Sequence, residues 1–341
     1  MSLARVAIHS SQFPDAVRLD LLESLRSRKI NHKFHYDSLK QTQKWLALHR
    51  AYSPSRTDPQ CAAVYQQSFA CTVQRLQSSR AHVVGLGCGG GQKDTAFLEL
   101  IHQSGREVFY TPSDVSTAMV LVAQQTALRV VPEANCFPLV CDLATAQDLP
   151  AILPAATGPS KVQMGDKLVG AQTPVKVFTF FGMIPNFEPD VILPKLASLL
   201  QPDDHLLFSA NLAPGSDYAA GVERVLPLYD NALTRDWLMT FLLDLGVERA
   251  DGELGFQIEK TAAFLDLRRI TATFTFVRDR MFEVESQRFE FRAGETVRLF
   301  YSYRHTPALV RTLLAQHGLE VLDQWVTPSQ EEGVFLVTKA S

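Results

Sequence analysis

The residues best suited to chemistry form a glycine-rich turn that follows a short apolar run. Val83 and Val84 lead into Gly85-Leu86-Gly87-Cys88-Gly89-Gly90-Gly91-Gln92-Lys93, and a helical pattern follows. Glycine lets the backbone turn tightly and approach a ligand where a Cβ atom would collide with it. The order of strand, glycine turn and helix therefore predicts a site for a nucleotide-type cofactor.

Three classes of cofactor site compete for this turn. A phosphate-binding P-loop is excluded because Gln92 separates the last glycine from Lys93, and Asp94 stands where serine or threonine is required. The spacing Gly85-x-Gly87-x-x-Gly90 formally matches a dinucleotide fingerprint, with Asp114 as a candidate ribose-binding acid. S-adenosylmethionine (SAM) sites use a looser glycine turn and an acid after the second strand. The turn alone leaves the last two classes open.

Three polar residues follow predicted strands at the edge where open α/β sheets bind ligands. The carboxylate of Asp114, after the second strand, can accept hydrogen bonds from both ribose hydroxyls. Asp142, after the third strand, can receive an adenine amino group, and Asn186, after the fourth, can both donate and accept. Each also has a plain structural interpretation as a helix cap or turn residue.

Composition limits the classes of function. The chain has 341 residues, 46% of them hydrophobic, which suits one large domain or a core domain with a sizeable insertion. The net charge of −3 indicates no nucleic-acid or anionic-membrane surface. Five cysteines without C-x-x-C spacing indicate reduced thiols, and we find no signal peptide and no span of about 18–20 apolar residues. We therefore expect a cytoplasmic monomer that binds neither nucleic acid nor membrane.

Metal and nucleophile chemistry find little support in the sequence. His32 and His35 flank Lys33-Phe34, but no third ligand follows at a suitable spacing. Cys88 lies in the glycine turn without a neighbouring base that would activate it. We expect no metal site.

The elements that must position these residues follow from the apolar pattern. Five strands separated mostly by helices predict a doubly wound parallel α/β sheet. The predicted strands are His82–Leu86, Glu107–Tyr110, Phe137–Cys141, Val175–Phe181 and His205–Ala210. Pro112 is expected to end the second strand, and residues 150–174 are expected to form a surface excursion.

The alternation of strand and helix stops near residue 213 and resumes near residue 295. Within this interval a helix is predicted around Trp237, and Arg269–Arg278 and Arg288–Arg292 are predicted as antiparallel strands. The interval is therefore a candidate inserted domain.

The end of the chain helps to choose between the cofactor classes. Thr306 before Pro307 predicts a helix start, with threonine as the cap and proline at the first helical position. Glu320–Thr327 and Gly333–Lys339 are predicted to form an antiparallel hairpin. A parallel sheet that ends in a helix and such a hairpin is the class I methyltransferase arrangement, which favours SAM.

Short motifs along most of the chain carry a family resemblance. They are Lys33-Phe34-His35-Tyr36-Asp37, Tyr52–Asp58, Leu86–Gly89 with Lys93, Asp114-Val115-Ser116, Phe181-Gly182-Met183 with Asn186-Phe187, Leu228–Asn231, and Ala293-Gly294-Glu295 before Ser302. In this order they resemble the histidine-specific, SAM-dependent N-methyltransferases of ergothioneine biosynthesis and relatives that methylate other amino-acid amines.

The resemblance implies roles for particular residues and segments. With the glycine turn, it assigns cofactor binding to Gly87, Gly89, Lys93, Asp114 and Asp142. It implies that residues 1–78 and 213–295 form an acceptor domain beside a SAM-binding core of residues 79–212 and 296–341.

The resemblance also implies residues for a small-molecule amine acceptor. Tyr52, Asn186 and Tyr229 would hold its carboxylate and amine, and Tyr36 would lie near the reacting nitrogen, which makes Tyr36 and Asn186 the expected catalytic residues. The list of acceptor-binding positions is completed by Phe300 and Ser302.

Several departures from the family pattern bear on the acceptor. Phe300 stands where the histidine enzymes carry the glutamate that holds the substrate imidazole, so we expect an acceptor other than histidine. Gly85 replaces an acid that is common before the glycine turn, and the loop before Asn186 is one residue short. The function expected is SAM-dependent N-methyl transfer to the amine of an amino acid or related small molecule. An NAD(P)-dependent oxidoreductase and a non-catalytic SAM-binding relative are the alternatives.

Overall fold

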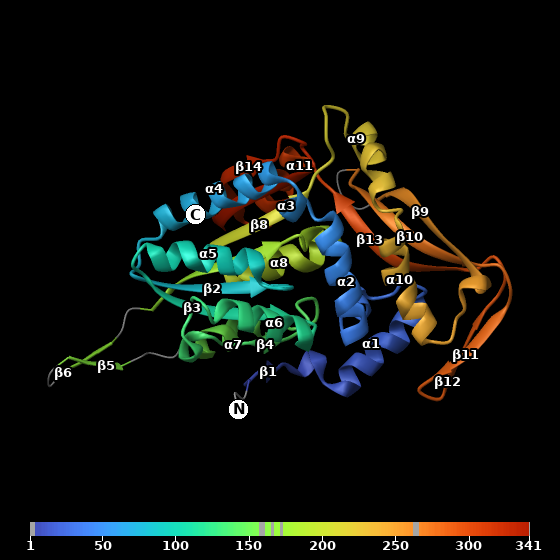
Figure 1. The fold of residues 1–341 in the computed structure, drawn as a ribbon, viewed down its shortest axis with the longest axis horizontal. Helices are drawn as coiled ribbons and strands as arrows, with labels where there is room; N and C mark the ends of the chain where they lie inside the picture. Colours follow the sequence, from blue (N-terminus) through green and yellow to red (C-terminus); the bar gives the residue numbers. More distant parts are fainter. Residues whose placement is uncertain (1–3, 157–160, 165–166, 171–172, 262–265, 341) are drawn as a thin grey trace.

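A large mixed sheet forms the centre of the fold in the computed structural model, which describes residues 4–156, 161–164, 167–170, 173–261 and 266–340 (Figure 1). Its eight strands lie in the order β1-β4-β3-β2-β7-β8-β15-β14. In this order they are Ala7–Ile8, Leu139–Val140, Glu107–Asp114, Arg80–Leu86, Val175–Phe181, His205–Asn211, Glu332–Lys339 and Leu319–Val326. The first six strands are parallel to one another, and β15 is antiparallel to both β8 and β14. The predicted doubly wound sheet and closing hairpin are confirmed.

The second strand of the sequence prediction differs from the structure, because β3 continues through Pro112 to Asp114. The carbonyls of Tyr110 and Asp114 accept from Phe137 and Cys141, so alternate residues of β3 face β4. Pro112 faces the same side, between an isolated bridge at Cys136 and the start of β4. The missing N–H of Pro112 therefore falls where the ladder is already interrupted, and the strand tolerates it.

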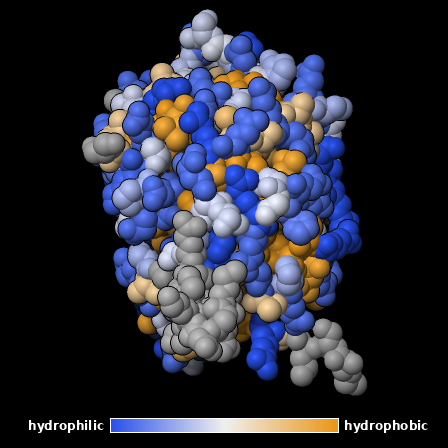
Figure 2. All heavy atoms as spheres, turned by 90° about the vertical axis from the view of Figure 1, so that its left-hand side faces the viewer, coloured by the Kyte–Doolittle hydropathy of each residue, from blue (hydrophilic) through white to orange (hydrophobic). Residues whose placement is uncertain are grey.

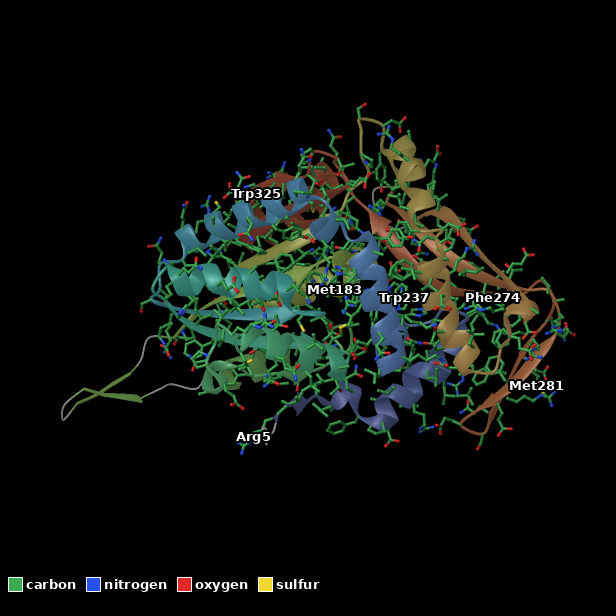
Figure 3. All side chains as sticks on the ribbon, viewed as in Figure 1. Arg5, Met183, Trp237, Phe274, Met281 and Trp325 are labelled. Atoms are coloured by element: carbon green, nitrogen blue, oxygen red, sulfur yellow. The ribbon has the colours of Figure 1, made fainter. Side chains whose placement is uncertain are left out.

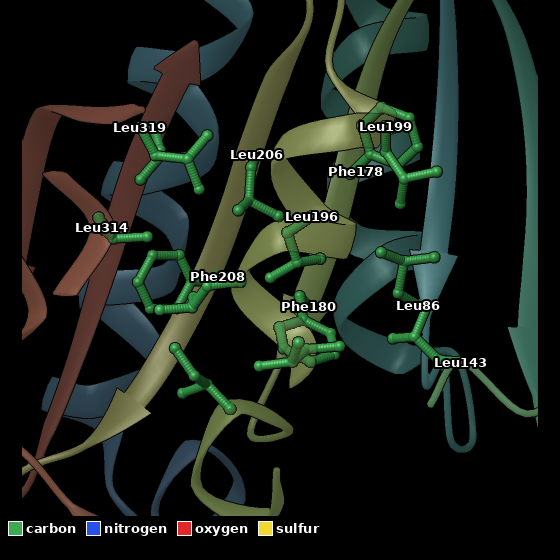
Figure 4. Close-up of a cluster of buried hydrophobic side chains, with 14 of the residues drawn as sticks. Leu86, Leu143, Phe178, Phe180, Leu196, Leu199, Leu206, Phe208, Leu314 and Leu319 are labelled. Carbon is green, nitrogen blue, oxygen red and sulfur yellow. The ribbon is translucent and has the colours of Figure 1, made fainter. Parts of the chain in front are cut away.

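Helices cover both faces of the large sheet. Val83 and Val177 point into a core with α4 (Pro59–Arg75), α5 (Gln92–Gln103) and the end of α6 (Thr117–Ala127). Val84 and Phe178 point into the opposite core with α7 (Leu149–Ala156), α8 (Pro189–Leu199) and α11 (Pro307–Ala315). Figure 4 shows part of this second core, including Phe208. The rings of Phe208 and Phe335 stack with their centroids 5.2 Å apart. Both faces are buried, as the continuous apolar strands predict.

A second sheet stands beside the large one, at the right of Figure 1. It has three antiparallel strands in the order β13-β10-β9, with bounds Thr296–Arg304, Arg268–Phe276 and Gly252–Lys260. The remaining elements of this part are the hairpin of β11 (Arg280–Val284) and β12 (Gln287–Phe291), with helices α9 (Tyr218–Val225) and α10 (Ala232–Asp244). The two strands expected in this interval correspond to β10 and β12. They do not pair with each other: β10 pairs with β9 and β13, and β12 pairs with β11. We expected the inserted segment to end at residue 295, whereas β13 pairs with β10 beyond that point.

Two N-terminal helices, α1 (Pro14–Ser27) and α2 (Leu39–Tyr52), pack into the body formed by the second sheet and α10, whereas α3 (Pro54–Thr57) packs against α4. Leu22 and Leu25 of α1 share a core with Trp237 of α10 and with Ala272 and Phe274 of β10. Residues near the start of the chain are therefore built into the same body as residues 232–300.

The remaining described elements are short. They are the 3₁₀ helices η1 (Ser10–Gln12), η2 (His32–His35), η3 (Glu133–Asn135), η4 (Ile184–Asn186), η5 (Leu226–Leu228) and η6 (Arg249–Asp251), and the hairpin of β5 (Lys161–Met164) and β6 (Lys167–Gly170). The hairpin projects from the large sheet in Figure 1, as expected of a surface excursion, whereas the first part of the expected interval forms α7, whose Leu153 is buried in the core. Residues 157–160, 165–166 and 171–172 of that excursion lie outside the described residues.

Figure 2, which views the side opposite the three-stranded sheet, shows mostly hydrophilic side chains with separate hydrophobic clusters between them. Among the described helices, none combines the length and apolar character needed to cross a membrane.

We predict that Thr306→Ala lowers the free energy of unfolding by about 1 kcal/mol, the usual effect of losing an N-cap oxygen. Thr306 Oγ1 accepts from the Leu309 N–H at 3.2 Å, and Pro307 begins α11 behind it. Thr306→Ser keeps the oxygen and should change stability by only a few tenths of that amount. Denaturant unfolding of the two variants checks this, and equal losses would argue against a capping role.

Candidate active site

A cavity of about 720 Å³ lies at the carboxyl ends of the central strands. Its walls come from the glycine turn after β2, the ends of β3 and β7, the N-terminal helices and β13. Met183 is one of its lining residues, and Figure 3 shows it between the ends of the strands and α2. The cavity therefore joins the large sheet to the second sheet at the edge where open α/β sheets bind ligands.

The glycine turn allows close approach of other segments. Gly87 has φ +68°, and a Cβ atom there would lie 2.7 Å from the sulfur of Met183. The Gly89 N–H donates to Oδ2 of Asp114 at 3.1 Å, and the Ser116 N–H donates to Oδ1 at 3.0 Å. Burial raises the pKa of Asp114 to about 6, and these backbone donors oppose the rise. The acid after β3 and the turn after β2 thus form one polar cradle, which suits a nucleoside.

Asp94 is a site residue that sequence reasoning missed. A Cβ atom at Gly85 would lie 2.3 Å from Oδ2 of Asp94, so the carboxyl group fills the space beside this glycine. Tyr110 and Thr179 donate to Asp94 at 2.7 and 2.8 Å, while burial raises its pKa to about 6. The departure at Gly85 thus makes room for an acid from α5. The only sequence signal was an acid at an unusual place after the glycine turn.

Lys93 and Asp142 both line the cavity, and both already have partners within the protein. Lys93 Nζ donates to the Tyr65 hydroxyl at 2.6 Å and lies 3.7 Å from Oε1 of Glu332. Asp142 accepts the Ala144 N–H at 2.9 Å, and Lys33 Nζ lies 3.3 Å from its other oxygen. These pairs fix the side chains in place before any ligand binds.

The two expected catalytic residues, Tyr36 and Asn186, both line the cavity. Asn186 ends η4, and its side chain has no hydrogen-bond partner among the described residues. Tyr36 packs against Trp45 and Trp237, with ring centroids 6.0 and 5.5 Å away. Burial, with a smaller contribution from Asp114, raises the pKa of Tyr36 above its usual range. Tyr36 therefore presents a protonated hydroxyl at neutral pH.

Four expected acceptor-binding residues do not line the cavity. Tyr52 is 53% exposed at the end of α2. The Tyr229 hydroxyl donates to Ser302 at 2.8 Å and accepts from Arg304 at 2.7 Å. Ser302 is itself buried, on the core-facing side of β13.

Phe300 lies behind the wall rather than in it. It is 7% exposed and packs against Trp237 and Tyr229, with its ring stacked on His32 at 5.0 Å. Side chains alternate along a strand, so the neighbouring Tyr301 faces the cavity while Phe300 faces the core. Residue 300 therefore acts on the cavity through His32, which does line it.

His32, Arg298 and Tyr301 form a part of the wall that sequence reasoning did not assign. His32 and His35 had been considered only as metal ligands. His35 is buried and its Nε2 bonds the Leu299 carbonyl at 2.7 Å. Arg298 and Tyr301 lie in no recognisable sequence motif. Their position in the cavity wall follows only from the pairing of β13.

Two comparisons of the sequence with known proteins give matches over most of the chain. A family model described as histidine-specific, SAM-dependent methyltransferase matches residues 17–339. An N-methyltransferase of Aspergillus flavus, imqF, is 25% identical over 294 residues, which cover 83% of this chain and 73% of that protein.

Two solved structures give matches with low sequence identity and TM-scores below 0.5. Magnesium protoporphyrin IX methyltransferase from Synechocystis has a TM-score of 0.42 and 14% identity, over 90% of this chain and 98% of that one. A 1,6-didemethyltoxoflavin-N1-methyltransferase from Burkholderia thailandensis has a TM-score of 0.41 and 12% identity, over 88% and 87%.

We predict that Asp114→Asn weakens binding of S-adenosylhomocysteine by about 1.5–3 kcal/mol, the usual loss for a charge-assisted hydrogen bond. Because the pKa of Asp114 is about 6, wild-type affinity should fall as pH drops below 6 and the carboxylate is protonated. The variant should show a shallower fall.

Calorimetry from pH 5 to 8 measures both effects. Asp203→Asn, at an exposed position, is the control and should match the wild type. An Asp114→Asn variant with wild-type affinity and an unchanged pH profile would remove Asp114 from the cofactor site.

Proposed function

Because the chain belongs to the histidine-specific, SAM-dependent methyltransferase family, we propose that it methylates the amine of an amino acid or related small molecule other than histidine. The observation that carries this proposal is the single cavity that joins the glycine turn and Asp114 to Asn186 and β13. Membership of this family argues against the alternative that the glycine spacing indicates an NAD(P)-dependent oxidoreductase. The named N-methyltransferase relative supports nitrogen as the acceptor atom.

The cavity residues suit SAM at one end. When bound, SAM supplies an electrophilic methyl group. Asp114 presents carboxylate oxygens beside the glycine turn, where they suit ribose hydroxyls, and Lys93 presents a cation beside Tyr65. Asp142 stands after β4 as the candidate partner of the adenine, although Lys33 already shares its carboxylate. Gly87 and Gly89 leave the backbone accessible there.

The other end of the cavity suits the amine. An ammonium has no free lone pair, so the acceptor must be held as, or converted to, the neutral amine. Asn186 can accept from the amine N–H or donate to a neighbouring oxygen, since its amide has both functions. Tyr36 stays protonated, so it orients the amine by hydrogen bonding, or helps relay the proton of the amine through water, rather than acting as a strong base. The rings of Trp45 and Trp237 flank the ring of Tyr36 and hold it in place.

The acceptor side offers little to an imidazole. Glu188 is a carboxylate in this part of the wall, and its oxygens are bound by the Tyr303 hydroxyl at 2.5 Å and by Arg269 at 3.0 Å. Phe300 and its stacked partner His32 bring rings instead of a free acid. A buried imidazole N–H without an acceptor is unfavourable, whereas an aromatic or aliphatic side chain gains contact area.

We predict that Asn186→Ala lowers kcat/KM for the amine by about tenfold or more while S-adenosylhomocysteine affinity stays within a few-fold. The reason is that the amide faces the acceptor side and has no other described partner. Turnover of labelled SAM and calorimetry on the same preparations separate the two effects. A parallel loss of cofactor affinity would move Asn186 to the cofactor half of the site.

We also predict that L-histidine is a poor substrate, disfavoured by about 1–3 kcal/mol against an acceptor with a largely apolar ring. A competition assay with equal L-histidine and L-tryptophan, followed by mass analysis of the methylated products, measures the ratio. Predominant methylation of histidine would contradict the expected specificity while leaving methyl transfer intact.

A further inference from the structure

A second hollow adjoins the cavity on the outer face of the three-stranded sheet. This groove, of about 530 Å³, is lined by side chains of β9, β10 and β13 and by residues 27–29. Lys29 and Arg298 line both the groove and the cavity, so the two hollows meet at these residues. The proposed function uses the cavity and leaves the groove without a role.

The groove follows a row of residues that lie side by side across the sheet. Gly255 of β9 pairs with Thr273 of β10, which pairs in turn with Arg298 of β13. Arg298 also forms a parallel bridge with Lys29. Neighbouring strands lie about 4.8 Å apart, so the row spans about 14 Å, which is the length of about four extended residues. A bound chain of a few residues could therefore lie along it.

A bulge in β13 turns Arg298 toward this face. The pairing of β10 with β13 shifts at this point, so that Leu299 is an extra residue in β13. Leu299 and Phe300 are both buried in the core, whereas Arg298 and Tyr301 both line the cavity. In a regular strand, residues 298 and 301 would point to opposite faces. The bulge therefore places the guanidinium group at the junction of cavity and groove.

Two like charges stand side by side at this junction. Neither Lys29 nor Arg298 makes an ion pair or a side-chain hydrogen bond with any residue in the described part of the chain. The guanidinium carbon of Arg298 lies 4.9 Å from the centroid of the Tyr301 ring. Like charges on paired residues of neighbouring strands are unfavourable. An anion bound between the two cations would relieve that repulsion.

The acids nearest to the junction are already engaged. Arg269 holds Glu188 and Glu259, both at 3.0 Å. Burial and the charge of Arg269 lower the pKa of Arg298, and the two glutamates oppose this only in part. The groove lining has more basic than acidic side chains, whereas the whole chain has a net charge of −3. The groove is therefore a positive region that favours an anionic ligand.

Beyond the cations, the groove offers hydroxyl groups and open space. The side chains of Thr273, Thr275 and Thr296 line it and have no hydrogen-bond partner among the described residues. At Gly255 an added Cβ atom would have only the Thr273 carbonyl oxygen nearby, at 4.0 Å. Hydroxyl groups can donate to and accept from amide groups. The groove therefore suits an extended chain with amide groups, such as a short peptide.

We propose that the acceptor is longer than a single amino acid, with its amine in the cavity and an anionic tail in the groove. This inference rests on the proposed function, because it names the substrate class of the same site. The chemistry is that of a short acidic peptide or a peptide-like amine. Its N-terminal amine enters the cavity, its first carboxyl group is an amide, and its terminal acid lies against Lys29 and Arg298. The negative charge is thus recognised outside the cavity, several bonds from the reacting nitrogen.

The test uses acceptors that share one amine and differ in the tail. They are L-tryptophan, tryptophyl-glutamate, tryptophyl-glycine, its neutral amide tryptophyl-glycinamide, and tryptophyl-lysine, with a leucyl series in parallel. The proteins are the full chain and its Lys29→Met and Lys29→Glu variants. Lys260→Glu is the matched control, because Lys260 is exposed on β9 and does not line the groove. Each protein is saturated with S-adenosylhomocysteine for calorimetry, and rates are measured with labelled SAM.

We expect the wild type to bind tryptophyl-glutamate about tenfold or more tightly than tryptophyl-lysine, with tryptophyl-glycinamide between them. Lys29→Met should narrow this ratio. Lys29→Glu should abolish it, because the new carboxylate neutralises Arg298. The neutral amide should change its affinity less than about twofold in both variants, which a collapsed site could not produce. Lys260→Glu should keep the wild-type ratio.

Equal binding of acidic, neutral and basic tails by the wild type would overturn the inference, as would a ratio unchanged in Lys29→Glu. A wild-type protein that binds none of the dipeptides would overturn it too. In each case, turnover of labelled SAM with free amino acids tells whether the proposed function still stands. In contrast, charge-dependent binding of the dipeptides without turnover of any amine would support the inference and overturn the proposed function.

Discussion

The site depends on one turn in which side chains from elsewhere occupy the space of missing Cβ atoms. At Gly85 that space holds the carboxyl group of Asp94, and at Gly87 it holds the thioether of Met183. Asp94 belongs to the helix after the turn, and Met183 belongs to the loop after β7. The backbone without side chains at the two glycines therefore lets both residues pack against the end of β2. A side chain at either glycine would push these elements apart and open the floor of the cavity.

The opposite wall depends on a pairing between distant parts of the chain. Residues 28–35 run along β13: Arg28 and Ile30 bond the backbone of Arg298, and the ring nitrogens of His32 and His35 bond the backbone of Tyr301 and Leu299. The N-terminal segment therefore completes the second sheet rather than serving only as a lead into the core. Any change that shifts β13 moves the histidines with it, so the shape of the acceptor side is set jointly by both segments.

Local patterns predicted much of the fold. The buried strands, the Thr306 cap and the closing hairpin each follow from a few neighbouring residues, and the structure confirms them. The polar residues after β3 and β7 were predicted for the same reason, since parallel strands end at a common edge. Pairings across long separations could not be read in this way. The face of β13 that Phe300 occupies, and the acid that fills the space at Gly85, depend on contacts that no local period encodes.

Most of the charged side chains discussed for the cavity are paired within the protein. Lys93 faces Glu332 and Lys33 faces Asp142, so these long side chains are ordered within the protein. Their conformational entropy is already lost on folding, and a ligand need not restrain them again. Such preordered ion pairs maintain the shape of the cavity. They discriminate weakly between ligands, because each charge is already neutralised by a partner within the protein. Selectivity must instead come from groups whose hydrogen-bonding capacity folding leaves unused, because a ligand lacking the matching group leaves them unsatisfied at a cost.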